Sequence, residues 1–115
     1  MNLTEHFTLE EMMYSNTALV FNIENRATAQ EIHNLYMLCV RVLEPLRKHF
    51  GKPIHINSGF RCKALNEKVG GAPNSYHTKG RAADIPWNKA YFDYIKNHLP
   101  HTELINEGGW IHVAL

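Results

Sequence analysis

The chain has 115 residues, of which 44% are hydrophobic and 20% are charged, a composition typical of a globular domain with one hydrophobic core. Twelve basic residues against eleven acidic residues leave a formal net charge of +1. The chain therefore lacks the strong field typical of proteins that bind nucleic acid or anionic membranes. No apolar run approaches the roughly 20 residues needed to span a bilayer. We expect one monomeric domain over residues 1–115, with no nucleic-acid partner and no membrane insertion.

The cysteines and the N-terminal residues bear on where the protein works. Two cysteines, Cys39 and Cys62, form neither a disulfide framework nor a CxxC pair, so we expect free thiols, one of them buried. The opening MNLTEHFTLEEM has no basic region followed by an apolar stretch, which predicts no signal peptide. We therefore expect synthesis in the cytoplasm, with release by other means if the substrate lies outside.

The first half of the chain predicts two helices that begin with capping boxes. Thr8 is followed by Glu11, and Thr28 by Glu31, the spacing in which both side chains satisfy free backbone N–H groups. Residues 15–25 between them predict a connector. After Thr28, apolar residues recur at helical spacing and predict a core-facing stripe, which consists of Ile32, Leu35, Tyr36, Cys39, Val42, Leu43 and Leu46. We expect Pro45 to kink this helix.

The second half of the chain predicts a small sheet. Residues 54–57 (IHIN) alternate as a strand does, residues 63–68 predict a short helix, and residues 80–85 predict a second strand. A helix is expected over residues 89–99. Residues 103–106 and 110–115 then predict two strands around a Gly108-Gly109 hairpin turn. Helices followed by a mostly antiparallel sheet indicate an α+β fold.

The stretch SYHTKGRAAD, residues 75–84, contains a candidate pair of metal ligands, His77 and Asp84. Asp84 lies in an apolar strand, where a carboxylate is costly unless it is paired or binds a metal. The small residues Gly80, Ala82 and Ala83 leave room for an ion to approach. The spacing alone also allows an ion pair from Asp84 to Arg81 or Arg61, with His77 capping a loop.

The alternation in WIHVA, residues 110–114, supplies a candidate third ligand. Ile111 and Val113 are expected to face the core, which leaves Trp110, His112 and Ala114 on the other face. His112 is then at the centre of a strand face, beside an indole that can wall a cleft. A catalytic zinc site takes three such protein ligands and keeps one position open.

Three motifs in order resemble one family. INSGFRCKALNEKVGGAPNSYHTKGRAADI, followed downstream by WIHV, closely resembles the zinc D,D-peptidases of the M15 class, whose pattern is SGxR, then SxHxxGxAxD, then a WxH strand. These include D-alanyl-D-alanine carboxypeptidases, vancomycin-resistance dipeptidases and phage endolysins, with the hedgehog N-terminal domain as a structural relative. The opening FTLEEMMYSNTA is similar to the small phage-type branch, so the resemblance covers nearly the whole chain. It implies a hedgehog/D,D-peptidase-like fold, with flanking helices around a small, mostly antiparallel sheet.

The resemblance also implies roles for single residues. Zinc (Zn²⁺) would be held by His77, Asp84 and His112, with a general base to take a proton from water. Many family members place an acid three residues before the last histidine, but here that position is Gly109. The nearest acid is Glu107, which the Gly108-Gly109 turn would let fold back toward the metal. The alternatives are an exposed hairpin role for Glu107 and Glu103 as the base, although Glu103 lies further along the strand.

The same resemblance implies a substrate site around the metal. Arg61 would donate two hydrogen bonds to a carboxylate or to the developing oxyanion, unless it is a surface or aspartate-paired arginine. Ser75 would bind substrate or orient its loop, and Trp110 would line the cleft. His55 and Asn57 share a strand face and are interpreted as structural.

These residues predict a zinc peptidase that hydrolyses peptidoglycan stem peptides, as a D-Ala-D-Ala carboxypeptidase or as an endopeptidase of the endolysin type. The absence of a signal peptide fits a phage or prophage lysis enzyme that a partner releases to the cell wall. The missing acid at position 109 keeps a second hypothesis open, a zinc-containing cell-wall binding module without catalysis. A metal-free structural domain is a third. Nickel or cobalt could also occupy a ligand set of two histidines and one aspartate.

Overall fold

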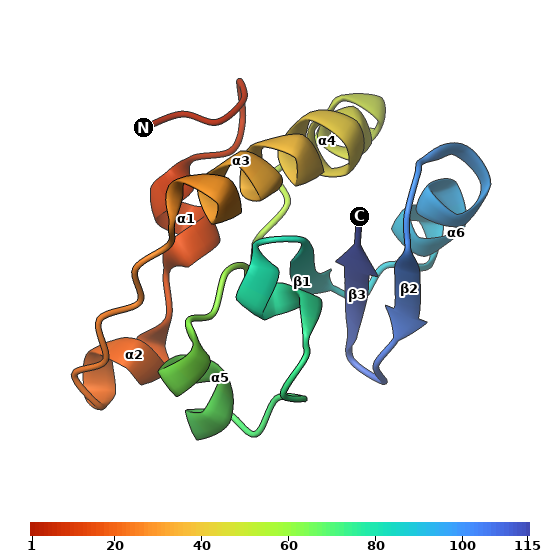
Figure 1. Ribbon diagram of the computed structural model, residues 1–115. Helices are drawn as coiled ribbons and strands as arrows, with labels where there is room; N and C mark the ends of the chain where they lie inside the picture. Colours follow the sequence, from red (N-terminus) through yellow and green to blue (C-terminus); the bar gives the residue numbers. More distant parts are fainter.

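A three-stranded antiparallel sheet organises the C-terminal half of the molecule (Figure 1). The computed structural model describes all residues from 1 to 115. Its strands are ordered β1-β3-β2, with β1 at Ala82–Pro86, β2 at Glu103–Asn106 and β3 at Trp110–Ala114. The turn between β2 and β3 contains Gly108 and Gly109, as the sequence predicts. The α+β class expected from the sequence is confirmed.

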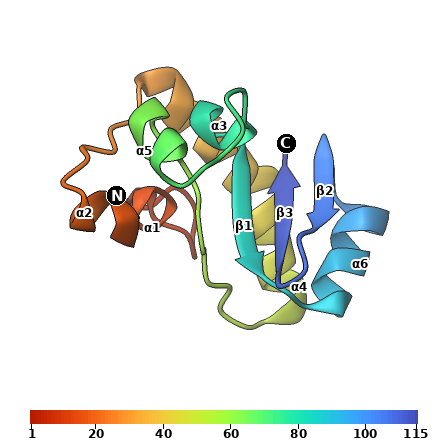
Figure 2. The ribbon, with the colours of Figure 1, turned by 90° about the horizontal axis from the view of Figure 1, so that it is seen from below.

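Helices precede and flank this sheet (Figures 1 and 2). They are α1 (Leu9–Met13), α2 (Asn16–Val20), α3 (Ala29–Leu38), the π-helical η1 (Cys39–Leu43), α4 (Glu44–Phe50), α5 (Lys63–Lys68), the 3-10 helix η2 (Tyr76–Lys79) and α6 (Lys89–His98). The elements α3, η1 and α4 follow one another without a break. None of these helices combines the length and hydrophobicity required to cross a bilayer.

Both predicted capping boxes are present. The hydroxyl of Thr8 accepts the N–H of Glu11, whose carboxylate accepts the N–H of Thr8 in return. Thr28 and Glu31 repeat this exchange at the start of α3. Each box satisfies two backbone donors that have no partner inside the helix, so these two helix starts follow directly from local sequence.

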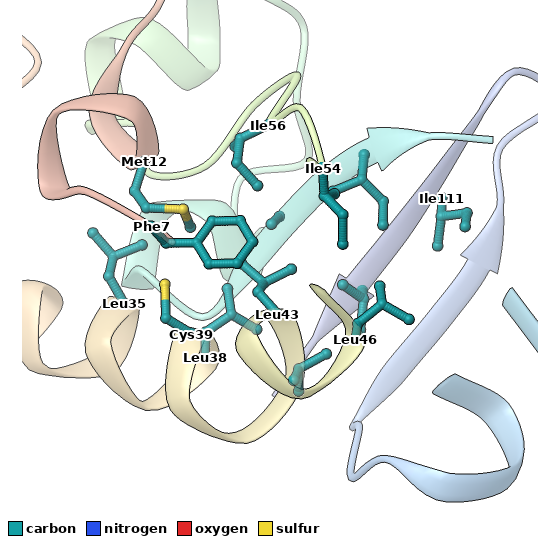
Figure 3. Close-up of a cluster of buried hydrophobic side chains, with 14 of the residues drawn as sticks. Phe7, Met12, Leu35, Leu38, Cys39, Leu43, Leu46, Ile54, Ile56 and Ile111 are labelled. Atoms are coloured by element: carbon teal, nitrogen blue, oxygen red, sulfur yellow. The ribbon is translucent and has the colours of Figure 1, made fainter. Parts of the chain in front are cut away.

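The hydrophobic core lies between one face of the sheet and the long helical run (Figure 3). Ala83 and Ile85 of β1, together with Ile111 and Val113 of β3, are fully buried on this face. Phe7 and the N-terminal helix α1 close the core from the other side, so segments from both ends of the chain contribute to it. The helical run contributes Leu35, Leu38, Cys39, Val42, Leu43 and Leu46. Since strand side chains alternate, the residues between the buried ones point to the opposite face of the sheet.

Two of the predictions about the helices are wrong in part. Residues 15–25 are not only a connector, because Ser15 accepts the N–H of Ala18 and caps the short helix α2. In the long helix, Tyr36 is 42% exposed and Leu38 takes its place in the core, since the buried stripe follows residues 35, 38 and 42. Directly before Pro45, which lacks a backbone N–H, the run is π-helical rather than α-helical.

The strand predicted over residues 54–57 is also wrong. Ile54 and Ile56 are buried while His55 is exposed, so the expected alternation of side chains exists. The backbone forms no ladder there, however, and a single bridge joins Ser58 to Asp84. Alternating burial indicates an extended segment that packs against the core, and such a segment need not be paired with another strand.

Both cysteines are free thiols, and Cys39 is the buried one. This confirms the expectation from cysteine count and spacing.

Candidate metal centre

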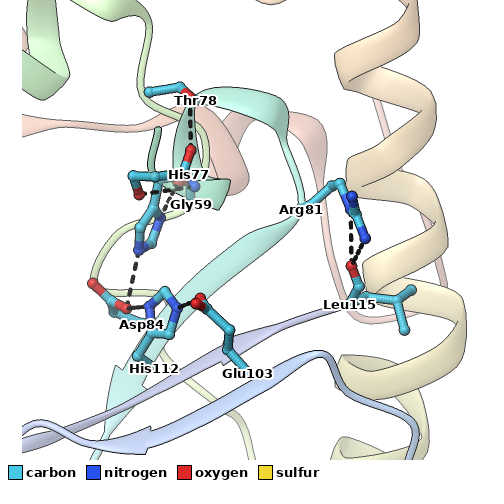
Figure 4. A network of polar contacts seen from close by, with 9 residues as sticks. Gly59, His77, Thr78, Arg81, Asp84, Glu103, His112 and Leu115 are labelled. Atoms are coloured by element: carbon cyan, nitrogen blue, oxygen red, sulfur yellow. Dashed lines mark hydrogen bonds and ion pairs between the residues drawn. The ribbon is translucent and has the colours of Figure 1, made fainter. Parts of the chain in front are cut away.

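The three predicted ligands meet on the face of the sheet opposite the core (Figure 4). Asp84 of β1 and His112 of β3 are directly paired across the two strands. His77 reaches the same point from η2. The sequence placed these residues in two separate motifs, and the pairing of the first strand with the last brings them together.

The ligand atoms converge on one carboxylate oxygen. His77 Nε2 lies 3.1 Å from Asp84 Oδ1, and His112 Nδ1 lies 3.0 Å from the same oxygen. One ligand atom from each of the three residues falls within 4.8 Å of the other two. Two imidazole nitrogens and a carboxylate oxygen are a donor set that zinc accepts. The residues present therefore fit a zinc ion with three protein ligands.

Hydrogen bonds among the three ligands shift the pKa values of Asp84 and His112. Burial on its own would raise the pKa of Asp84, but hydrogen bonds from His112 and His77 outweigh it and lower that pKa to about 2. Hydrogen bonding to Asp84 raises the pKa of His112, against the opposing effect of burial. Asp84 is therefore a carboxylate at neutral pH, which is the form that binds a metal.

Local backbone structure explains the spacing of the SxHxxG motif. The hydroxyl of Ser75 caps η2 and accepts the N–H of His77 at 3.2 Å. Gly80 ends η2 in the left-handed conformation, with φ of 70°. A Cβ atom at Gly80 would lie 2.4 Å from the carbonyl oxygen of Glu31. The expectation that Gly80 makes room for an ion is wrong, because the absence of a side chain at Gly80 makes room for α3 instead.

The SGFR segment supports the ligands from the other side. Ser58 accepts the N–H of Asp84 through its carbonyl oxygen at 2.8 Å. The Gly59 carbonyl oxygen lies 2.7 Å from His77 Nδ1, and the Arg61 N–H donates to the His77 carbonyl at 3.1 Å. A Cβ atom at Gly59 would lie 2.2 Å from the Met12 carbonyl oxygen, so only glycine fits between α1 and the ligand.

A pocket of about 680 Å³ opens above the three ligands. The structure brings all the other predicted site residues to its lining: Arg61, Ser75, Glu107 and Trp110. Trp110 is 41% exposed and shares the strand face of His112. These residues come from four different parts of the fold, and their roles toward substrate remain predictions.

Arg61 is not paired with Asp84 in the way the alternative hypothesis required. Its Nε is buried and has no hydrogen-bond partner, and burial lowers the pKa of Arg61 although the nearby Asp84 opposes this shift. Arg81, the other proposed partner of Asp84, donates from Nε and Nη2 to the Leu115 carbonyl oxygen instead (Figure 4). Arg61 thus lines the pocket without a hydrogen bond from its Nε to Asp84.

Of the two candidate bases, Glu103 begins β2 and Glu107 lies in the turn that follows this strand. Glu103 and Glu107 both line the pocket, with Ile105 between them at the period of two that a strand imposes. The N–H of Glu107 donates to the Trp110 carbonyl at 3.0 Å, so the backbone closes across the glycine turn, and Glu107 lines the pocket. Glu103 lies further along the strand, as expected, and its Oε1 is 2.8 Å from His112 Nε2.

Sequence reasoning missed two contacts of the ligands. The Gly59 carbonyl could not be found from side-chain motifs, because it is a backbone group. Alternation on residues 103, 105 and 107 predicts one face for both glutamates, but the contact between Glu103 and His112 also requires the register of β2 against β3.

Two comparisons relate the chain to known proteins. The family model described as Peptidase M15 matches residues 5–114. The zinc D-Ala-D-Ala carboxypeptidase of Streptomyces albus G is 50% identical over 44 residues, which are 37% of this chain. The match spans only 17% of that relative's own length.

Proposed function

The chain belongs to the Peptidase M15 family, and from this premise we propose that it is a zinc-dependent peptidase acting on peptidoglycan stem peptides. The observation that carries the proposal is the convergence of His77, Asp84 and His112 beside Glu107 and Arg61 in one solvent-open pocket. The similarity to a zinc D-Ala-D-Ala carboxypeptidase supports an amide of a D-amino acid as the bond that is cleaved. The bond is terminal in a carboxypeptidase and internal in an endopeptidase.

In this proposal His77, Asp84 and His112 hold the metal. When bound, zinc supplies Lewis-acid chemistry, which polarises a carbonyl group and increases the acidity of water. The protein holds its ligands in place before binding, because each of them is already oriented by a hydrogen bond. Such pre-organisation lowers the cost of assembling the centre.

Glu107 is proposed as the general base and then the general acid. It lies at the turn end of the hairpin, where it lines the pocket. It would accept a proton from the attacking water and donate it to the leaving amine. A positioned carboxylate in this role contributes about 10²–10⁴-fold to the rate.

Arg61, Ser75 and Trp110 are proposed to bind the substrate. The guanidinium of Arg61 presents two parallel donors, a geometry that matches a peptide carboxylate or a developing oxyanion. Trp110 offers an apolar surface in the lining of the pocket, and the Ser75 hydroxyl already accepts the N–H of His77. Arg61 therefore has the largest unused capacity for hydrogen bonding to substrate.

The first test is hydrolysis of purified peptidoglycan, and of a stem peptide ending in D-Ala-D-Ala, by zinc-loaded wild-type protein and Glu107→Gln. We expect one zinc per chain in both proteins, and a rate lower by about 10²–10⁴-fold in the variant. Glu24→Gln is the control, because Glu24 is exposed and pairs only with Arg26. The two substrates separate internal from terminal cleavage.

Two results would contradict the proposal. Wild-type protein that binds one zinc and releases nothing from either substrate supports the cell-wall binding module, which sedimentation with peptidoglycan then checks. Wild-type protein without stoichiometric zinc supports a metal-free structural domain.

A further inference from the structure

The two histidines of the metal centre are held in the same way, although by different partners. Each one directs a ring nitrogen at Asp84 Oδ1, Nε2 in His77 and Nδ1 in His112. Each one also has its remaining ring nitrogen against a fixed acceptor. For His77 this acceptor is the Gly59 carbonyl oxygen at 2.7 Å, and for His112 it is Glu103 Oε1 at 2.8 Å (Figure 4).

The position of Glu103 relative to the ring decides what it can do. Glu103 contacts the nitrogen of His112 that points away from Asp84, so the imidazole ring stands between this carboxylate and the point where the ligands converge. Glu103 is opposite Ala114 in the β2–β3 ladder, whereas Glu107 lies at the turn, next to Trp110. A general base has to reach water at the centre, and the imidazole ring of His112 separates Glu103 from that point.

Histidines that bind metals almost always donate their other N–H to a carboxylate or a carbonyl, which fixes the tautomer and the ring orientation. We propose that Glu103 is a positioning residue that holds His112 as its Nε2–H tautomer, with Nδ1 directed at the metal, and that Glu103 is not the general base. The inference rests on the zinc site of the proposed function. It gives the two glutamates of β2 and its turn separate tasks.

The test measures zinc affinity. Removing a residue that positions a ligand should lower this affinity, whereas removing a general base should not. Metal-free wild-type protein, Glu103→Ala, Glu103→Gln and Glu107→Gln compete with a chelator for zinc. Loss of such a supporting partner costs about 10–100-fold in metal affinity, and we expect that loss in Glu103→Ala. Glu103→Gln keeps an oxygen that accepts the Nε2–H and should recover part of it. Glu107→Gln removes an equal charge nearby and should bind zinc more tightly than Glu103→Ala.

A second measurement does not depend on any variant. Long-range ¹⁵N–¹H spectra of the zinc-loaded wild-type protein identify which nitrogen of His112 carries the proton, and we expect Nε2. A proton on Nδ1 would overturn the inference, and so would wild-type zinc affinity in a folded Glu103→Ala. A fall in affinity in Glu107→Gln as large as that in Glu103→Ala would overturn it too, because charge alone would then explain the effect.

These outcomes are distinct from those of the proposed function. If the wild-type protein binds zinc without hydrolysing peptidoglycan, the peptidase proposal fails while the affinity order and the His112 tautomer still support Glu103 as a positioning residue. If hydrolysis is found and Glu103→Ala binds zinc normally, only the inference on Glu103 fails. If the wild-type protein binds no zinc, both are wrong.

Discussion

At the scale of the single residue, Arg61 and Arg81 show how one side-chain type serves two purposes. Arg81 gives two of its donors to the Leu115 carbonyl oxygen and fixes the end of β3. Arg61 leaves its buried Nε without a partner at the pocket wall. Because an unsatisfied buried donor costs free energy, the fold alone does not explain the position of Arg61.

We predict that Arg61→Lys lowers the rate of peptide hydrolysis by about 10²–10³-fold, the usual cost of losing an oriented donor to the oxyanion. Lysine keeps the positive charge but not the planar pair of donors. Steady-state kinetics of the zinc-loaded protein measures the loss, and zinc content should stay at the wild-type level.

Arg81→Lys is the matched control. It removes the planar pair of donors to the Leu115 carbonyl oxygen, which lies outside the pocket. It should therefore lower the free energy of unfolding by about 1 kcal/mol and leave hydrolysis by the folded protein intact. Equal rates for Arg61→Lys and wild type would show that the guanidinium does not bind substrate.

At the scale of the elements, the site depends on how η2 is fixed between α3 and β1. Gly80 and Gly51 have nearly the same left-handed φ, 70° and 68°. A Cβ atom at Gly80 would lie 2.4 Å from the Glu31 carbonyl oxygen in α3. A Cβ atom at Gly51 would have no other atom within 4 Å. Replacing Gly51 by alanine thus tests the cost of the left-handed backbone alone, whereas replacing Gly80 by alanine adds the cost of a steric clash.

We predict that Gly51→Ala lowers the free energy of unfolding by about 1–2 kcal/mol, the cost of a left-handed non-glycine residue. Gly80→Ala should lose a further 1–3 kcal/mol, about the cost of overpacking. Urea denaturation of the two metal-free variants measures the difference. Equal losses would mean that α3 moves away from η2 at little cost, and the close packing would then not position His77.

The elements also show what local sequence can and cannot predict. Capping boxes, the hairpin turn and the ligand motifs depend on residues close in sequence, and the structure contains each of them. The contact from Glu103 to His112 depends on the register of β2 against β3, and the missing strand at residues 54–57 depends on whether a second backbone is available. Both are properties of tertiary structure, which residue patterns specify only weakly.

At the scale of the whole molecule, one sheet separates the core from the metal centre. Its inner face packs on the helical run, and its outer face carries Asp84 and His112. The N-terminal segment joins the helical run through Glu44, which is 7% exposed and accepts the N–H of His6 at 2.8 Å and its Nδ1–H at 2.7 Å. The stability of the fold therefore depends in part on one buried carboxylate far from the pocket.

We predict that Glu44→Gln lowers the free energy of unfolding by about 1.5–3 kcal/mol at neutral pH, since it weakens hydrogen bonds to a charged group. Burial would raise the pKa of Glu44, but hydrogen bonds from His6 outweigh it and the pKa is lowered. A lowered folded-state pKa contributes stability above the unfolded-state value of about 4.3, and this contribution is lost as pH falls through the folded-state pKa. The gap between wild type and Glu44→Gln should therefore close in acid.

Urea denaturation of both metal-free proteins at a series of pH values measures this gap, with Glu24→Gln as the control because Glu24 pairs with Arg26 on the surface. A gap that stays constant down to the acid limit would mean that Glu44 is not charged in the folded protein, and its link to His6 would then be a neutral hydrogen bond. A gap that closes shows that the charged carboxylate of Glu44 stabilises the link between the N-terminal segment and α4, and that acid weakens this link. Since Met12 of α1 contacts both the core and Gly59, a weaker link would reduce the support of His77 from a distance.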